Sequence, residues 1–132
     1  MKKRGFGKGK WNGVGGKKED GETLLQAAAR EVEEEIGVEV QGEDFEERGT
    51  LLFSFEGDAQ GPFLVHVFFV YRWSGEPTES EEMAPRWYSI DTVPYKDMWV
   101  DDEHWLPGAL AEEVLKRHFH LSATGDEIIS MD

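Results

Sequence analysis

Residues 16–38 constrain this chain more than any other segment. They begin with Gly16, carry Glu22 six residues later, and end in the run Arg30-Glu31-Val32-Glu33-Glu34-Glu35-Ile36-Gly37. If the segment is helical, the carboxylates of Glu31, Glu34 and Glu35 lie at spacings of three and four and share one arc of its surface. Like charges at i,i+4 cost roughly 0.2–0.5 kcal/mol per pair, and a divalent cation would turn that cost into binding energy. The pattern predicts a metal-binding helix, with a solvated glutamate-rich helix as the alternative.

The ends of this helix can be predicted from local signals. Thr23 with Gln26 three residues later forms a capping box at the start, and Gly37 is typical of the left-handed residue that ends a helix. Arg30 stands i,i+4 from Glu34 and is expected to hold it in place. An apolar stripe, expected to be buried, follows the same helix at Leu25, Ala28, Ala29, Val32 and Ile36.

Composition indicates one domain over residues 1–132, long enough to bury a packed core. There is no cysteine, so neither a disulfide nor a thiolate metal site is expected. The basic start leads into no apolar stretch, and no run is long enough to span a membrane, so the expectation is a cytoplasmic protein without a membrane partner.

The net charge of −14 hides an asymmetry along the chain. Residues 1–18 hold seven basic side chains and no acidic one, whereas the other 114 residues hold seven basic against 28 acidic. The strongly acidic residues 19–132 should repel a nucleic-acid polymer. The glycine-rich basic segment beside an acidic helix suits a small polyphosphate bridged by a cation, and a disordered basic tail is the alternative for residues 2–10.

The remaining pattern predicts an α+β fold. Strands are expected at 50–55, at 63–73 as a central strand apolar on both faces, and at 86–90. Loops are expected at 56–62 and 74–82. A second helix should begin at Pro107 and run to about residue 117, and a hairpin should follow from 118–123 to 127–131.

Residues 16–38 match every fixed position of the Nudix box, so the chain resembles the Nudix hydrolases. Within that superfamily it resembles the animal-type oxidised purine nucleoside triphosphatases, homologues of MutT that hydrolyse 8-oxo-dGTP and 2-oxo-dATP. The resemblance covers nearly the whole chain, and its specific stretches are MKKRGFGKGKWNGVGGK at the start, VHVF at 65–68, ESEEMAPRW at 79–87 and VPYKDMWVDDEHW at 93–105. It implies the Nudix fold, an α/β/α sandwich with a mixed central sheet.

The resemblance also implies a metal site. Its ligands would be the backbone carbonyl of Gly15 and the carboxylates of Glu31, Glu34, Glu35 and Glu82, with Glu81 as the alternative to Glu82. Mg²⁺ is the expected ion, with Mn²⁺ as the alternative, because such hard dications prefer oxygen ligands. One glutamate should act as general base, and Glu35 and Glu82 are the candidates.

A base pocket follows from the same resemblance. Asn12, Trp99, Asp101 and Asp102 would contact the purine, with Phe53 and Phe55 as apolar walls. If desolvation raises the pKa of one aspartate, a neutral and an ionised carboxyl would form a donor–acceptor pair able to fit more than one oxidised purine. The alternatives are a core tryptophan at Trp99 and a solvated, helix-capping turn at Asp101-Asp102. Further substrate contacts are expected from Lys2, Val14, Gly15, Gly16 and Lys17.

In that branch about twenty residues precede the position of Met1 and form a first strand, so the sheet is expected to lack this strand and to expose an edge that favours aggregation. The protein should then be a monomer, or a homodimer that covers the edge. Among other candidates, His118 and His120 would share one strand face but have no third ligand nearby. His66 lies inside an apolar strand and is expected to be a core or strand-pairing residue.

The favoured function is metal-dependent hydrolysis of a nucleoside triphosphate to monophosphate and pyrophosphate, with oxidised purine nucleotides as substrates and nucleotide-pool sanitation as the role. Two alternatives stay open. One is a Nudix hydrolase of another nucleoside diphosphate derivative, and the other is a truncated, non-catalytic nucleotide-binding module.

Overall fold

The structure is a computed structural model that describes residues 1–5, 7–58 and 61–132. Contacts divide the chain into two compact units, residues 1–46 with 70–89 (unit 1) and residues 47–69 with 90–132 (unit 2). Two helices and a mixed sheet confirm the expected α+β class. Within the described part of the chain, no helix is long and apolar enough to cross a bilayer. One domain over the whole chain stays a prediction.

Unit 1 is organised around helix α1, Leu24–Ile36. Thr23 and Gln26 form the predicted capping box in both directions, and Gly37 ends the helix with φ 70° while its N–H donates to the Glu33 carbonyl. Glycine adopts the left-handed conformation without the steric cost that other residues have, so the position of Gly37 in the sequence determines where the helix ends.

The face that α1 buries differs from the prediction. The buried residues of the helix are Ala27 and Glu35, whereas Leu25 of the predicted stripe is 37% exposed. Ala27, Glu31 and Glu35 are spaced by four and lie on one face. Loop residues of unit 1 cover this face at Glu31 and Glu35, as the contacts of Gly15 and Gly16 described below show. The other four residues of the predicted stripe, Ala28, Ala29, Val32 and Ile36, are half-buried, and Glu34 is exposed.

The N-terminal segment is part of unit 1. Lys2 bridges Met83, the Lys3 amide donates to the Glu82 carbonyl at 2.9 Å, and the Ala84 amide donates to the Met1 carbonyl at 2.9 Å. Residues 1–3 therefore run antiparallel to residues 82–84, and the alternative of a disordered tail does not hold for this stretch. The Lys3 ammonium also contacts the Ser80 carbonyl at 2.7 Å and pairs with Glu79.

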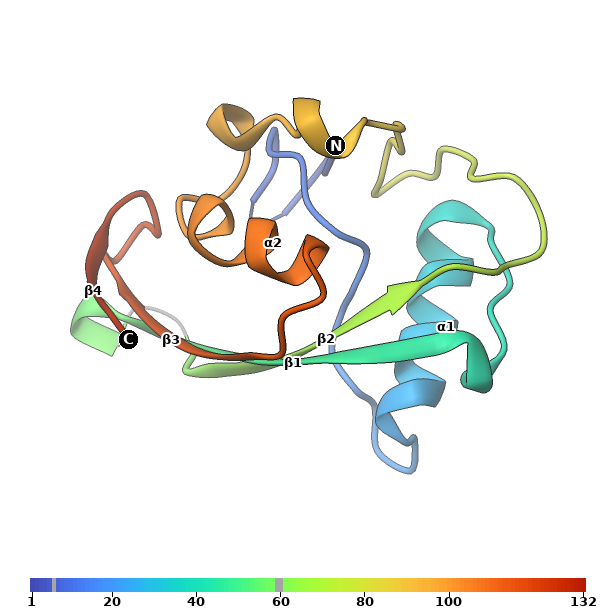
Figure 1. Cartoon of the computed structure of the whole chain (residues 1–132), viewed down its shortest axis with the longest axis horizontal. Helices are drawn as coiled ribbons and strands as arrows, with labels where there is room; N and C mark the ends of the chain where they lie inside the picture. Colours follow the sequence, from blue (N-terminus) through green and yellow to red (C-terminus); the bar gives the residue numbers. More distant parts are fainter. Residues whose placement is uncertain (6, 59–60) are drawn as a thin grey trace. The chain divides into compact units, whose positions relative to one another are not determined.

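Unit 2 holds most of the sheet, in the order β2-β1-β3-β4 (Figure 1). The strands are β1 Phe45–Phe55, β2 Phe63–Val70, β3 Leu115–Leu121 and β4 Ile128–Met131. β1 and β3 are parallel, with Phe53 beside Phe119, and β3 and β4 are antiparallel, so the sheet is mixed. The predicted hairpin at the C-terminal end is confirmed as β3–β4.

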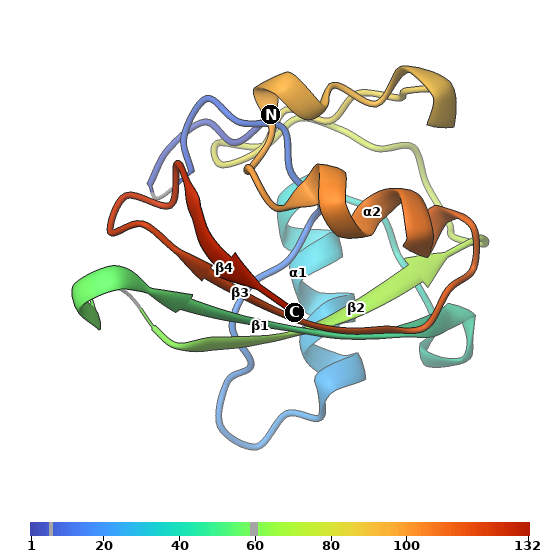
Figure 2. The ribbon, with the colours of Figure 1, turned by 60° about the vertical axis from the view of Figure 1, so that its left-hand side comes forward.

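Helix α2, Asp102–Leu110, lies over one face of this sheet (Figure 2). Ala109 packs there against Leu51, Phe55, Phe119 and Leu121, all almost fully buried. Because strand residues alternate between faces, residues 51, 53 and 55 of β1 share the core side and Ser54 lies on the other side.

Three predicted elements differ from the structure, although the strand predicted at 63–73 is confirmed over residues 63–70. The strand at 63–73 ends at Val70 and lies at the edge of the described sheet, with Leu64 60% exposed, because apolar content does not fix which strand a backbone pairs with. Residues 86–89 form no strand. The second helix begins five residues before Pro107, which lies inside it, and Leu115 belongs to β3. The loop predicted at 56–62 falls partly on residues 59–60, outside the described residues; the loop at 74–82 is confirmed, apart from the bridge between Ser74 and Glu39.

Candidate active site

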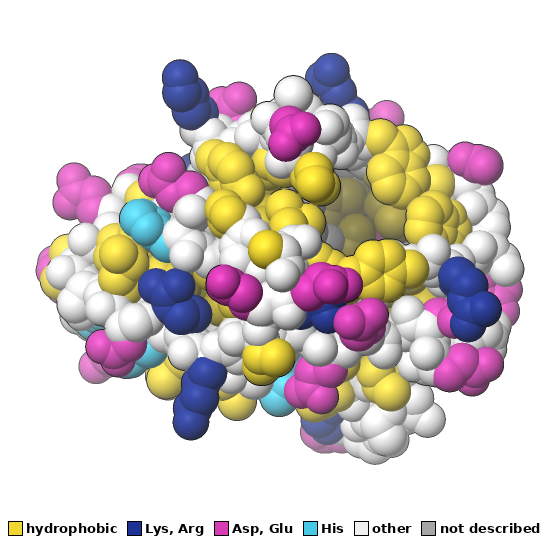
Figure 3. Space-filling view, viewed as in Figure 1, with side chains coloured by type: hydrophobic (Ala, Val, Ile, Leu, Met, Phe, Trp, Pro, Cys, Tyr) yellow, Lys and Arg dark blue, Asp and Glu magenta, His cyan; other side chains and the backbone are white. Residues whose placement is uncertain are grey.

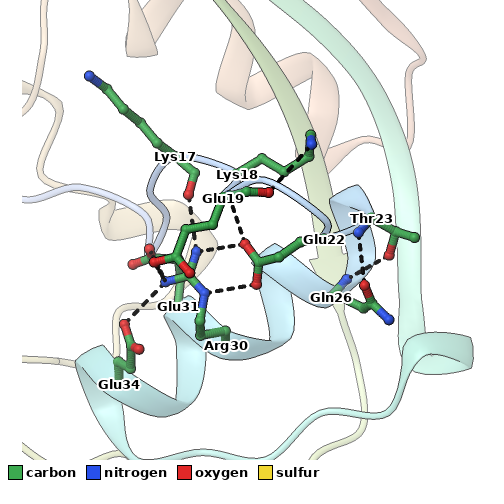
Figure 4. Close-up of polar contacts among 9 residues, drawn as sticks. All are labelled: Lys17, Lys18, Glu19, Glu22, Thr23, Gln26, Arg30, Glu31 and Glu34. Atoms are coloured by element: carbon green, nitrogen blue, oxygen red, sulfur yellow. Dashed lines mark hydrogen bonds and ion pairs between the residues drawn. The ribbon is translucent and has the colours of Figure 1, made fainter.

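Arg30 organises the glutamates of α1 (Figure 4). Its guanidinium donates to Glu22 at 2.9 and 3.0 Å, to Glu31 at 2.7 Å and to Glu34 at 3.3 Å, and also reaches the Lys17 carbonyl at 3.0 Å. The hydrogen bond from Arg30 lowers the pKa of Glu22 to about 2. Arg30 therefore connects the helix to the loop before it, and its contact with Glu34 confirms the predicted pairing of these two residues.

Gly15 and Gly16 lie directly against the carboxylates of α1. A Cβ at Gly16 would come within 2.4 Å of the Glu31 carboxyl carbon, so glycine leaves room for this carboxylate. The Gly15 amide donates to Glu35 Oε2 at 3.3 Å. The loop thus contacts the helix through glycine backbone atoms, because a side chain at Gly16 would collide with the Glu31 carboxylate.

An open cavity of about 310 Å³ lies beside this face within unit 1, and it is lined by Arg4, Glu31, Glu34, Glu35, Ser80, Glu81 and Glu82. Four of the five predicted metal ligands therefore border one space. Arg4 enters from the N-terminal segment and donates to Glu82 Oε1 at 3.1 Å. Arg4 is also 3.8 Å from Glu81, but Glu81 is 90% exposed, whereas Glu82 is nearer to Arg4 and its charge raises the pKa of Glu35. These differences favour Glu82 over Glu81 as the metal ligand.

Glu35 is the most buried carboxylate of this cavity, at 9% exposure. Burial, together with the negative charges of Glu31 and Glu82, raises the pKa of Glu35 to about 7. The Gly15 amide and the positive charge of Lys2 act in the opposite direction, which places the predicted substrate residue Lys2 within electrostatic reach of the site. A carboxyl with a pKa near neutrality can both take up and release a proton under physiological conditions.

The donor chemistry fits a hard dication, although the carboxylates do not converge in their present rotamers. Over the described ranges, no three histidine, aspartate or glutamate side chains are arranged to hold a metal ion. Glu31 is turned to Arg30 and Glu82 to Arg4, so arginines compensate their charge. Glu31, Glu34, Glu35 and Glu82 offer only oxygen donors around an open space, which is the set that Mg²⁺ and Mn²⁺ prefer. The Gly15 carbonyl as a ligand stays a prediction.

A second acidic pair lies in unit 2 at the start of α2. Asp101 and Asp102 are 3% and 4% exposed, so the alternative of a solvated turn is wrong. The Trp105 indole donates to Asp101 Oδ2 at 2.8 Å, and the Asp102 amide donates to the Trp99 carbonyl at 3.1 Å. Burial raises the pKa of both carboxyls, and for Asp102 the charge of Asp101 raises it further. The direction of both shifts agrees with the predicted pair of one neutral and one ionised aspartate, and the sequence prediction did not say which of the two is neutral.

The other predicted base contacts divide between the two units. Trp99, Phe53 and Phe55 share unit 2 with the aspartates; Phe53 stacks on Phe119 at 5.9 Å and Phe55 is buried. Asn12 and Val14 belong to unit 1, where the Asn12 side chain is exposed and accepts from the Gly13 amide. Lys17 contributes its carbonyl to Arg30, while its ammonium points away from that network (Figure 4). A joint base pocket therefore stays a prediction.

Two residues that sequence reasoning missed belong to these sites. Arg4 lines the acidic cavity, and no local spacing relates it to Glu82 because the two residues are far apart in the chain. Trp105 stands four residues after Asp101 on α2, so its hydrogen bond was open to prediction once the helix had been placed correctly.

Comparisons with known proteins agree with this geometry. Residues 1–109 match the family model of the NUDIX domain. The chain is 45% identical over 119 residues to the oxidized purine nucleoside triphosphate hydrolase of Danio rerio and 44% identical to that of Mus musculus, in each case over 90% of this chain and 74% of the relative. It also resembles the crystal structure of a mutator MutT protein from Bacillus halodurans, with a TM-score of 0.82 and 26% identity over 94% of this chain and 82% of that one. Nudix hydrolases generally act with a divalent metal ion, which the oxygen donors of the cavity suit. The chain belongs to the Nudix family of hydrolases.

Proposed function

We propose that this protein hydrolyses oxidised purine nucleoside triphosphates, such as 8-oxo-dGTP and 2-oxo-dATP, to the monophosphate and pyrophosphate, and so cleanses the nucleotide pool. The observation that carries the proposal is the acidic cavity beside α1, which five glutamates line and where Glu31 and Glu35 contact a glycine loop that follows a basic segment. The oxidised purine specificity comes from the vertebrate relatives, whose names state that activity.

In this proposal Mg²⁺ is held by Glu31, Glu34, Glu35 and Glu82, and when bound it neutralises phosphate charge and lowers the pKa of a coordinated water. The residues of the chain position and polarise the reactants, which is most of what phosphoryl chemistry asks of a protein. Arg30 keeps Glu31 and Glu34 in place, and Glu22 in turn holds Arg30. These two residues organise the site without touching the reacting atoms.

Proton transfer falls to a buried carboxylate. Glu35 and Glu82 are both candidates for the general base, and Glu35 is the more buried of the two. Glu82 is more exposed and is paired with Arg4. Lys2 and the backbone amides of the glycine loop would then contact the phosphates.

Recognition of the base is assigned to Asp101 and Asp102. Their raised pKa values favour sharing one proton, so that one carboxyl donates to a base carbonyl while the other accepts from a base N–H. The indole of Trp105 fixes the orientation of Asp101. Trp99 would stack on the purine, a contact that contributes about 1–3 kcal/mol per base.

Product analysis tests the proposal. With 8-oxo-dGTP and Mg²⁺, we expect 8-oxo-dGMP and pyrophosphate, little turnover of dGTP, and none after chelation of the metal. Equal turnover of dGTP and 8-oxo-dGTP would favour a Nudix hydrolase of other nucleotide derivatives. A protein that binds these nucleotides and hydrolyses none of them would contradict the proposal and favour a binding module.

A further inference from the structure

Three polar side chains meet on the sheet face of unit 2 that lies opposite its core. Ser54 Oγ on β1 is 3.0 Å from Nε2 of His118 and 2.8 Å from Nδ1 of His120, both on β3. Phe119, between the two histidines, points to the core side and is fully buried. The alternation of side chains along β3 thus directs two imidazoles, both half-buried, to one shared point.

The hydroxyl between the rings restricts their protonation. A serine hydroxyl has one hydrogen to donate, so at most one of the two ring nitrogens accepts from it and the other must donate an N–H. Both ring nitrogens can donate an electron pair at the same time only to a cation bound between them. The Ser54 hydroxyl would then rotate away or become a ligand of the cation itself. Neutral imidazole binds metals through either Nε2 or Nδ1, so the two different nitrogens are no obstacle.

A carboxylate lies on the same face. In the β3–β4 ladder His120 is opposite Ser130, and the Asp132 amide donates to the His118 carbonyl at 3.0 Å, so Asp132 stands across from His118. Directly opposed residues of antiparallel strands project to the same face with Cβ atoms about 4.5–5.5 Å apart. In the conformation of the described side chains, no third histidine or acidic group is in a ligating position, so the Asp132 side chain has to rotate toward the imidazoles.

We propose that His118, His120 and Asp132 form a second cation site, selective for a transition-metal dication such as Zn²⁺, with Ser54 or water completing its shell. Two imidazoles and one carboxylate are an established zinc set that leaves a position open. Imidazole nitrogen favours Zn²⁺, Cu²⁺ and Ni²⁺, whereas Mg²⁺ favours oxygen, so this site and the all-oxygen cavity of unit 1 should select different ions. Such an ion would join β3 to β4 and stabilise the folded protein by binding to it preferentially.

Calorimetric titration of the intact protein with Zn²⁺ tests the site. To remove the acidic cavity as a competitor, the titration uses Glu35→Gln as the background. We expect one Zn²⁺ to bind to the unmodified cluster. His118→Ala or His120→Ala should weaken binding at least about tenfold, because each removes an imidazole ligand. Asp132→Asn should weaken it only about threefold, because the Asp132 carboxylate is a flexible ligand. Binding should weaken at acidic pH because protons compete for the imidazoles.

Matched controls keep the test falsifiable. His104→Ala removes a histidine of α2 that is not part of this cluster and should leave Zn²⁺ affinity unchanged. If an alanine variant fails to fold, His118→Gln keeps much of the side-chain volume without the imidazole and should show the same loss. With Mg²⁺ as the only metal, His118→Gln should hydrolyse nucleotides like the unmodified protein. Zn²⁺ affinity that is the same with and without His118 and His120, or that disappears entirely in Glu35→Gln, would overturn the proposal.

Discussion

The two units each carry a cluster of carboxylates, and their surroundings give the two clusters opposite properties. In unit 1 the glutamates around α1 border an open cavity, and Arg30 and Arg4 donate hydrogen bonds to Glu31 and Glu82. The hydrogen bond from Arg30 also lowers the pKa of Glu22. In unit 2 the aspartates at the start of α2 are buried, and this burial raises the pKa of both carboxyls, although the Trp105 indole acts in the opposite direction. Under the proposed function, the carboxyl group would bind a cation in unit 1 and donate a hydrogen bond to the base in unit 2. Only Glu35, buried by the glycine loop, combines both settings.

The acidic surface agrees with this division. Acidic side chains are scattered over the face seen in Figure 3, with basic ones among them. Charge alone therefore does not distinguish a functional carboxylate in this protein, and burial together with its partner does.

The largest expected effect comes from Glu35→Gln. Loss of a candidate general base and metal ligand should reduce kcat for 8-oxo-dGTP by about 10²–10⁴-fold. Steady-state pyrophosphate release measures it. Glu33→Gln, an exposed glutamate on the same helix, is the matched control and should retain activity. If Glu35→Gln hydrolyses 8-oxo-dGTP at the normal rate, the assignment of this cavity as the active site is wrong.

Removal of the Asp102 carboxyl, the proposed hydrogen-bond donor in unit 2, should reduce the preference for 8-oxo-dGTP over dGTP. Asp102→Ala should lower kcat/KM for 8-oxo-dGTP relative to dGTP by about 10–100-fold, since an unsatisfied polar partner costs about 1–3 kcal/mol. Asp102→Asn should lose less, because the amide still donates. Asp97→Asn changes an exposed aspartate and serves as control. An unchanged preference in Asp101→Asn, Asp102→Asn and Asp102→Ala would contradict the base pocket.

A smaller effect is expected at Arg30, which positions carboxylates through its fork of N–H groups. Arg30→Lys keeps the charge but cannot hold Glu22, Glu31 and Glu34 together, so kcat/KM should fall about tenfold and the Mg²⁺ concentration needed for half-activity should rise. Arg72→Lys, which alters an ion pair with Asp44, should change neither value. Normal metal dependence in Arg30→Lys would show that the network is only structural.

The smallest expected effect is on the pH dependence of the melting temperature, which should have opposite signs for Glu22 and Asp102. The lowered pKa of Glu22 adds stability that is present above pH 4.5 and is lost as pH falls toward about 2. The raised pKa of Asp102 acts in the opposite direction, since its contribution is complete below pH 3.8 and is lost as pH rises through the folded pKa.

Thermal melts between pH 2 and 9 measure this difference. Glu22→Gln should be less stable than the unmodified protein at pH 7 and equal to it near pH 2. Asp102→Asn should gain relative stability as pH rises. Parallel pH curves for both variants would mean that burial does not set the two clusters apart.

Much of unit 1 could be predicted from sequence because its signals are local. The capping box at Thr23, the glycine end at Gly37 and the spacing of Glu31, Glu34 and Glu35 all act within a few residues. The edge position of β2 and the true start of α2 could not be predicted. Strand order depends on backbone pairing between distant segments, and Pro107 is compatible with more than one position in a helix.

The sequence by itself determined that α1 forms, where it ends and which carboxylates share its surface, since these depend on helical geometry and on the backbone freedom of glycine. Only the tertiary structure decided which carboxylates are buried and what each one contacts. The pairing of Arg4 with Glu82, the burial of Asp101 and Asp102 and the meeting of Ser54 with His118 and His120 all join segments far apart in the chain or depend on loss of solvent. Protonation follows from these surroundings, and they exist only in the folded molecule.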